Sequence, residues 1–172
     1  FDFQRLRRAD QIQAAPLLTL TSRFDAPGVA PFSADAFALT PVTLLEGGTL
    51  KCLTPSLYGS RKTGLPHVAV GADGWDMDSG TTPLDALIAG VPRGALVDRL
   101  SMGRPSASGD FSGVIKNSFV IRDGMVGTAL SETMISGNVA QMLRDVSAVS
   151  AERIDTGGWV LPWLRVEGLH FS

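Results

Sequence analysis

The chain has 172 residues, of which 44% are hydrophobic and 19% charged, and its formal net charge is −2 at pH 7. This composition is typical of a folded globular chain and excludes a disordered one, because enough apolar surface is available to form a core. This net charge does not indicate a basic surface that would bind nucleic acid. No apolar run is long enough for a membrane helix. One cysteine and two histidines exclude a disulfide scaffold and argue against a zinc site within this chain.

The first half of the chain predicts short elements separated by turns. We predict the end of a helix over residues 1–13 and then strands over residues 17–21, 42–45, 49–53 and 68–70. Glu46-Gly47-Gly48 lies between two of these strands and predicts a hairpin turn. Thr54-Pro55 predicts the start of a short helix, with Thr54 as its N-cap, and Gly64 predicts its end.

The second half continues with strands and two short helices. The strands are predicted over residues 94–100, 111–122, 125–130, 146–149 and 159–166. The helices are predicted from Thr82-Pro83 to Gly90 and from Asn138 to Asp145. Asp123-Gly124 is a strong two-residue hairpin turn. We therefore predict one α+β domain over residues 1–172, mainly antiparallel, with barrel-like or sandwiched hairpins and a few short helices.

The candidate binding segment is Gly109-Asp110-Phe111-Ser112-Gly113. It is not a nucleophile elbow, because the elbow needs a Gly two residues before its Ser and a helix after it. Two interpretations stay open. A Gly-rich loop that enters a strand lets the backbone approach a peptide ligand, and the same pattern is typical of a bulge or tight bend.

Cys52, His67 and His170 are the remaining residues with reactive or ligating side chains. Cys52 lies in a hairpin strand and is interpreted as a small buried hydrophobe. Each His is interpreted as structural or solvated. A hydrolase that uses Ser112 with His67 or His170 is the lowest-ranked hypothesis, because no triad signature supports it.

Several segments, in matching order and spacing, resemble the TldD/PmbA (TldE) family. Members carry a G-D-[FY]-S stretch, a hairpin with a Gly turn and a "TIAGNLxxML" helix start, which Gly109–Ser112, Ser118–Gly124 and Thr133–Leu143 resemble. The closing "lPxlxIegL" strand is similar to Leu161–Leu169. Earlier segments that resemble the family are Pro16–Leu20, Arg23–Val29, Thr40–Leu53 and Ser60–Gly64.

The resemblance implies a cytoplasmic, two-subunit peptidase that processes or degrades peptides. Its TldD-type subunit carries zinc through an H-E-x-x-x-H helix and a distant Cys, and its PmbA (TldE)-type subunit lacks these ligands. This sequence has no H-E-x-x-x-H, and residues 150–159, where a TldD-type chain would carry its Cys, contain none. The family's N-terminal half, where a zinc helix would lie, is absent from this chain. The resemblance therefore implies the C-terminal domain of a PmbA/TldE-like subunit with no catalytic residue, metal ligand or cofactor of its own.

The expected function is to pair with a zinc-bearing TldD-like subunit and to help form a peptide chamber. The partner would supply the metal and a Glu base, and Gly109–Gly113 would contact the peptide. The alternative is a regulatory or structural binding module, which the family's older label, modulator of DNA gyrase, describes. Neither expectation includes nucleic acid or a membrane among the partners.

Overall fold

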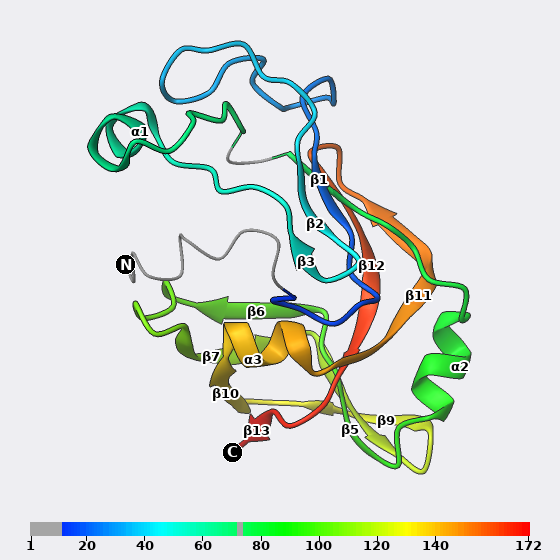
Figure 1. The fold of residues 1–172 in the computed structure, drawn as a ribbon. Coiled ribbons are helices and arrows are strands. Elements are labelled where there is room, and N and C mark those ends of the chain that lie inside the picture. The colour runs from blue at the N-terminus through cyan, green and yellow to red at the C-terminus, as the bar shows by residue number, and fades with distance from the viewer. Residues whose placement is uncertain (1–11, 72–73) are drawn as a thin grey trace. The chain divides into compact units, whose positions relative to one another are not determined.

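The structure is a computed structural model that describes residues 12–71 and 74–172 (Figure 1). Its strands form sheets of six, four and three strands, and most of the strand pairs are antiparallel. Three short helices accompany them, so the predicted α+β class is confirmed. The helix end predicted over residues 1–13 falls almost wholly outside the described residues. No helix in the described part of the chain is both long and apolar enough to cross a membrane.

The chain divides into two compact units. One holds residues Gly80–Glu152 and Trp163–Ser172, and the other holds the described residues up to Ser79 together with Arg153–Pro162. We call them the C-terminal unit and the N-terminal unit. That residues 1–172 form one domain stays a prediction.

The six-stranded sheet has the order β11-β12-β4-β1-β2-β3. Its strands are β1 (Leu20–Ser22), β2 (Thr43–Glu46), β3 (Thr49–Leu50), β4 (Trp75–Met77), β11 (Val146–Asp155) and β12 (Trp159–Val166). β12 pairs with β4 in parallel, and β1 pairs with β2 and β4 antiparallel. The predicted hairpin turn at Gly47-Gly48 is confirmed, with φ of 53° and 76°. A Cβ on Gly48 would collide with the Ala14 carbonyl oxygen, so this position requires glycine.

Helix α1 (Leu57–Thr63) ends at Gly64, as predicted, in the left-handed conformation. Its N-cap is Ser56, whose hydroxyl accepts a 3.1 Å hydrogen bond from the Gly59 N–H. The prediction of Thr54 as the cap was wrong by two residues, because Ser56 supplies the same capping oxygen closer to the helix. The strand predicted over residues 68–70 is absent, and this segment is irregular.

The C-terminal unit contains the four-stranded sheet β13-β10-β7-β6 and the three-stranded sheet β5-β8-β9. Their strands are β5 (Arg93–Leu96), β6 (Arg99–Met102), β7 (Asp110–Lys116), β8 (Ser118–Arg122), β9 (Met125–Leu130), β10 (Met134–Asn138) and β13 (His170–Phe171), and the helices are α2 (Leu84–Ala89) and α3 (Val139–Arg144). The Asp123-Gly124 turn is confirmed, since Arg122 pairs with Met125 across it.

Two predicted strands of this unit are each broken into two. The strand over 111–122 breaks at Asn117, whose φ is 48°, and continues as β8 in another sheet. Asn tolerates this left-handed conformation, so one residue can redirect the chain. The strand over 94–100 also divides, at residues 97–98, into β5 and β6, which belong to different sheets.

Alternation along β7 positions its side chains. Phe111 and Ile115 are buried and form a core cluster with Ile135 of β10, whereas Asp110, Ser112 and Lys116 are exposed. Partly buried residues that pack on this cluster are Val97, Leu100, Met102, Leu130, Val139, Met142, Leu169 and Phe171. The four-stranded sheet therefore has one apolar face on the core and one polar face.

Candidate functional site

The polar face of the four-stranded sheet carries a row of hydroxyl and imidazole groups. Ser112 of β7 is opposite Ser136 of β10, and Ser136 is opposite His170 of β13. Residues paired across antiparallel strands have side chains on the same face, so these three groups lie in one line across the sheet. Ser112 and His170 are exposed, and Ser136 is partly so.

A hydrogen-bonded cluster lies next to this row, at the start of β7. The Asn138 side-chain amide donates to the Asp110 carboxylate at 2.8 Å and to the Ser108 carbonyl oxygen at 3.0 Å. The Ser108 hydroxyl donates to the other Asp110 oxygen at 2.5 Å. The Ser106 hydroxyl accepts the Asp110 N–H at 3.0 Å and lies 2.8 Å from the Ser108 hydroxyl. The loop before β7 is thus fixed to the end of β10.

Asn138 also caps helix α3. Its side-chain oxygen accepts hydrogen bonds from the Ala140 N–H at 3.0 Å and the Gln141 N–H at 3.3 Å. Hydrogen bonds from Asn138 and Ser108 lower the pKa of the Asp110 carboxyl, because they stabilise its ionised form. Asp110 is therefore a carboxylate at neutral pH, and its oxygens are largely engaged within the chain.

The five predicted binding residues play different parts in the structure. Gly109 has a φ of +95°, which the turn into β7 requires. Phe111 belongs to the core. A Cβ on Gly113 would lie 2.7 Å from the Met102 Cβ and 2.8 Å from the Ser101 carbonyl oxygen. Only Asp110 and Ser112 present exposed side chains. That the segment binds a peptide stays a prediction.

The structure does not bring Ser112 and His170 together, as one form of the lowest-ranked hydrolase hypothesis requires. Strands in a sheet lie about 4.8 Å apart, and the intervening β10 separates Ser112 from His170 by about 10 Å, beyond hydrogen-bond reach. His67 belongs to the N-terminal unit, where its Nε2 lies 3.3 Å from the Asp35 carboxylate. The pairing of Ser112 with His67 stays a prediction, because the two residues lie in different units.

Cys52 is half-buried, and its Sγ lies 3.5 Å from the carbonyl oxygen of Thr43. Burial raises the pKa of the Cys52 thiol. A thiol with a raised pKa is a weak nucleophile and a poor metal ligand at neutral pH, because the thiolate is the reactive form. The prediction of a buried Cys52 inside a hairpin strand was wrong, because β3 ends at Leu50 and Cys52 follows it with its side chain half-buried.

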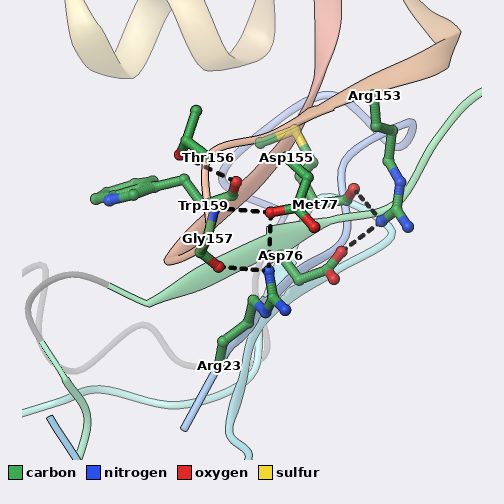
Figure 2. A network of polar contacts seen from close by, with 8 residues as sticks. All are labelled: Arg23, Asp76, Met77, Arg153, Asp155, Thr156, Gly157 and Trp159. Atoms are coloured by element: carbon green, nitrogen blue, oxygen red, sulfur yellow. Dashed lines mark hydrogen bonds and ion pairs between the residues drawn. The ribbon is translucent and has the colours of Figure 1, made fainter. Parts of the chain in front are cut away.

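The turn between β11 and β12 is held by Arg23, as Figure 2 shows. The Arg23 guanidinium donates a 2.8 Å hydrogen bond to the Gly157 carbonyl oxygen and lies 3.6 Å from the Asp155 carboxylate. Asp155 also accepts the Gly157 N–H at 2.8 Å. Thr156 closes the turn through its N–H, which donates to the Trp159 carbonyl oxygen at 2.9 Å.

A second arginine of the same network joins β11 to β4 (Figure 2). The Arg153 guanidinium lies 2.6 Å from the Asp76 carboxylate and 3.2 Å from the Met77 carbonyl oxygen. Both side chains of the ion pair are about one-third exposed. Solvent therefore weakens the pair, and its contribution is that of a partly exposed salt bridge.

This turn does not fit a zinc site. Zinc in proteins is bound by thiolate, imidazole or carboxylate ligands, and the only such group at the turn, Asp155, lies beside a guanidinium and accepts a backbone hydrogen bond. A fixed positive charge at this distance opposes a cation. Across residues 12–71 and 74–172, no three His, Cys, Asp or Glu side chains are grouped closely enough to hold a metal.

Sequence patterns did not identify these polar clusters. Asn138 was recognised as the start of a helix, but its bond to Asp110 joins residues 28 apart. Arg23 and Gly157 are 134 residues apart. The one local signal was the Asp-Thr-Gly-Gly run at residues 155–158, which is typical of a tight turn with an Asp that accepts a nearby N–H.

The fold matches solved structures over nearly the whole chain. A proposed modulator of DNA gyrase from Bacteroides thetaiotaomicron has a TM-score of 0.83 and 29% identity over 97% of this chain and 39% of its own. A proposed modulator of a DNA gyrase from Thermotoga maritima has a TM-score of 0.82 and 21% identity, over 96% of this chain and 41% of its own. TldE from Thermococcus kodakarensis has a TM-score of 0.77 and 21% identity, over 96% and 42%. The chain thus spans about two-fifths of the length of each.

A search of curated proteins finds no match. A family profile described as the PmbA/TldA metallopeptidase C-terminal domain matches residues 6–172. This match covers nearly the whole sequence and includes the segments on which the resemblance rests. The chain therefore belongs to the PmbA/TldA metallopeptidase C-terminal domain family.

Proposed function

We propose that this chain is the C-terminal part of a TldE-like subunit that carries no zinc and pairs with a zinc-bearing TldD-like subunit in a cytoplasmic peptidase. The family match and the resemblance of its fold to TldE support this proposal. The chain spans about two-fifths of the length of its structural relatives, so the activity is one of the whole assembly. The partner's zinc would polarise the scissile carbonyl and activate water.

The observation that carries the proposal is the chemistry of the turn at residues 155–159. The resemblance puts the Cys ligand of a TldD-type chain in this part of the sequence. Here the same part holds Asp155 and Gly157 bound to the guanidinium of Arg23. The Arg23 guanidinium already binds the polar groups of this turn. The proposed subunit would therefore form walls of the chamber and would supply no metal ligands.

The polar face of the four-stranded sheet is the proposed place of peptide contact. Ser112, Ser136 and His170 offer hydroxyl and imidazole groups in a row, and Asp110 lies at its end. Such groups can form hydrogen bonds with the backbone N–H and C=O groups of an extended peptide, whatever the side chains of that peptide are. Of the predicted segment Gly109–Gly113, the proposal uses only the exposed Asp110 and Ser112.

Co-purification tests this function. The longer protein that contains this chain should form a stable complex with an H-E-x-x-x-H subunit from the same genome, and the mixture should cleave peptides that neither subunit cleaves alone. Zinc should co-elute with the H-E-x-x-x-H subunit after the two are separated. Absence of both association and peptide cleavage would contradict the proposal, and would favour the regulatory binding module instead.

A further inference from the structure

Helix α3 has only six residues, and both of its ends are tied to other segments of the C-terminal unit. An isolated helix of this length is not stable in water, because too few hydrogen bonds offset the ordering of its backbone. The helix therefore depends on the contacts at its ends and on the packing of its side chains. Loss of one of these supports should unfold all of α3 rather than a single turn of it.

The first end of α3 is tied to the loop before β7. Asn138 caps the helix, and its side-chain amide binds the Asp110 carboxylate. The Val139 N–H donates a 2.9 Å hydrogen bond to the Gly109 carbonyl oxygen. Within the loop, the Gly109 N–H donates to the Ser106 carbonyl oxygen at 2.9 Å. The loop and the helix thus share Asn138, so a displacement of this residue breaks hydrogen bonds in both.

The other end of α3 is tied to the segment that leads into β13. The Asp145 N–H donates to the Gln141 carbonyl oxygen at 2.9 Å, and the Asp145 carboxylate accepts the Gln141 side-chain amide at 2.8 Å. The Asp145 carbonyl oxygen accepts the Glu167 N–H at 3.3 Å. A Cβ on Gly168 would lie 3.5 Å from the Asp145 carboxylate. Residues 167–168 therefore contact the end of the helix.

The same segments also meet in the core. Val139 and Met142 of α3 pack on the core cluster of β7 and β10, and Leu169 from the segment before β13 packs on the same cluster. Unfolding of α3 would remove two of the side chains that cover this cluster. It would thereby weaken the packing on which the position of Leu169 depends, because side chains in a close-packed core support one another.

We propose that α3 is a conformational coupler, whose folding and unfolding make the loop at residues 106–110 and the segment at residues 167–171 open and close together. Coupling of this kind needs a two-state element to which both segments are bound, and a short helix that is stable only in place is such an element. The two segments carry opposite ends of the polar row, Asp110 and His170. The coupling itself goes beyond the proposed function and does not depend on it. Only the corollary, that a peptide bound at one end of the row orders the other end, rests on the proposed function.

Amide hydrogen exchange tests this inference on the longer protein that contains this chain, measured by mass spectrometry without partner or peptide. Two variants perturb opposite ends of α3. Asn138→Ala removes the cap, and Gly168→Ala forces a side chain into the left-handed conformation, at a φ of 75°, beside Asp145. We expect each variant to raise the exchange rate roughly threefold or more in every coupled segment, including the one farther from the substitution. These segments are residues 106–110, 139–145 and 167–172.

The matched control is Gly64→Ala, which imposes the same backbone strain, at a φ of 74°, on the end of α1 in the N-terminal unit and meets nothing within 4 Å. It should leave exchange in the three segments unchanged. Within the C-terminal unit, the β8–β9 hairpin should keep its wild-type exchange in all variants. Faster exchange in that hairpin as well would show a general loss of stability and would overturn the coupling.

Faster exchange that stays at the substituted end of α3 also overturns the inference. If Asn138→Ala fails to fold, as circular dichroism would show, the effect of Gly168→Ala on residues 106–110 decides. No partner, peptide or metal takes part in this experiment. Its failure therefore leaves the proposed function intact, and failure of the co-purification experiment leaves the coupling intact.

Discussion

The side-chain amide of Asn138 donates a 2.8 Å hydrogen bond to the carboxylate of Asp110 while its oxygen caps helix α3. One residue at the end of β10 thus joins the loop before β7 to the start of a helix. The cluster lies at one end of the polar row formed by Ser112, Ser136 and His170. Changes at Asn138 therefore test the support of the proposed peptide-binding face.

Replacing Asn138 with Ala should reduce the free energy of unfolding by about 1 kcal/mol, because α3 loses its N-cap. Urea unfolding followed by circular dichroism measures this loss. The matched control is Asn138→Ser, whose hydroxyl oxygen can still cap the first N–H groups of α3 but which lacks the side-chain amide that binds Asp110 and Ser108. Equal losses in both variants would show that the cap is not the main contribution.

Asp110 should make stability depend on pH in the acid range. Its pKa is lowered in the folded chain, so its contribution is fully present above the unfolded pKa of about 3.9 and is lost as the pH falls through the folded value. The stability difference between wild type and Asp110→Asn should therefore be constant above about pH 5 and shrink at lower pH. Denaturation series across this range measure it, and a difference that grows on acidification would refute the assignment.

Gly113→Ala should destabilise the chain by about 1–3 kcal/mol, because the new methyl group would overlap with Met102 and Ser101 of β6. Gly103→Ala is the control, since a Cβ there meets nothing within 4 Å. Thermal unfolding of both variants distinguishes packing from ligand contact as the reason for glycine at 113. A Gly113→Ala variant with unchanged Tm and weakened peptide binding would favour ligand contact.

The Arg153–Asp76 ion pair should have a coupling energy of roughly 0.5–1 kcal/mol, since both side chains are about one-third exposed. A double-mutant cycle of Arg153→Ala and Asp76→Ala measures it, and the coupling should fall as salt is added. A coupling near zero at low salt would mean that the ion pair contributes nothing to the link between β11 and β4, which are separated in the sheet by β12.

Local signals in the sequence were sufficient for turns and helix ends. Asp123-Gly124 and Gly64 lie where predicted, because each needs a backbone conformation that only a few residue types adopt readily. The strand breaks at Asn117 and at residues 97–98 were not predicted, because a break of one or two residues moves the chain to another sheet without changing the hydrophobic pattern.

The polar clusters could not be predicted for a different reason. Arg23 reaches Gly157 across 134 residues, and Arg153 reaches Asp76 across 77. Such pairs depend on the order of strands in the sheet. The hydrophobic pattern within each strand does not determine that order. The Ser112, Ser136 and His170 row likewise depends on the register of three strands that are distant in sequence.

Metal analysis of the separated subunits is the most direct test of the proposal that this chain belongs to the subunit without zinc. The purified complex is dissociated in mild denaturant without chelator, and each subunit is measured by mass spectrometry of the metal. We predict one zinc per H-E-x-x-x-H subunit and only trace zinc in the subunit that contains Arg23 and Asp155. One zinc per molecule of the latter, retained when it is purified alone, would contradict the proposal.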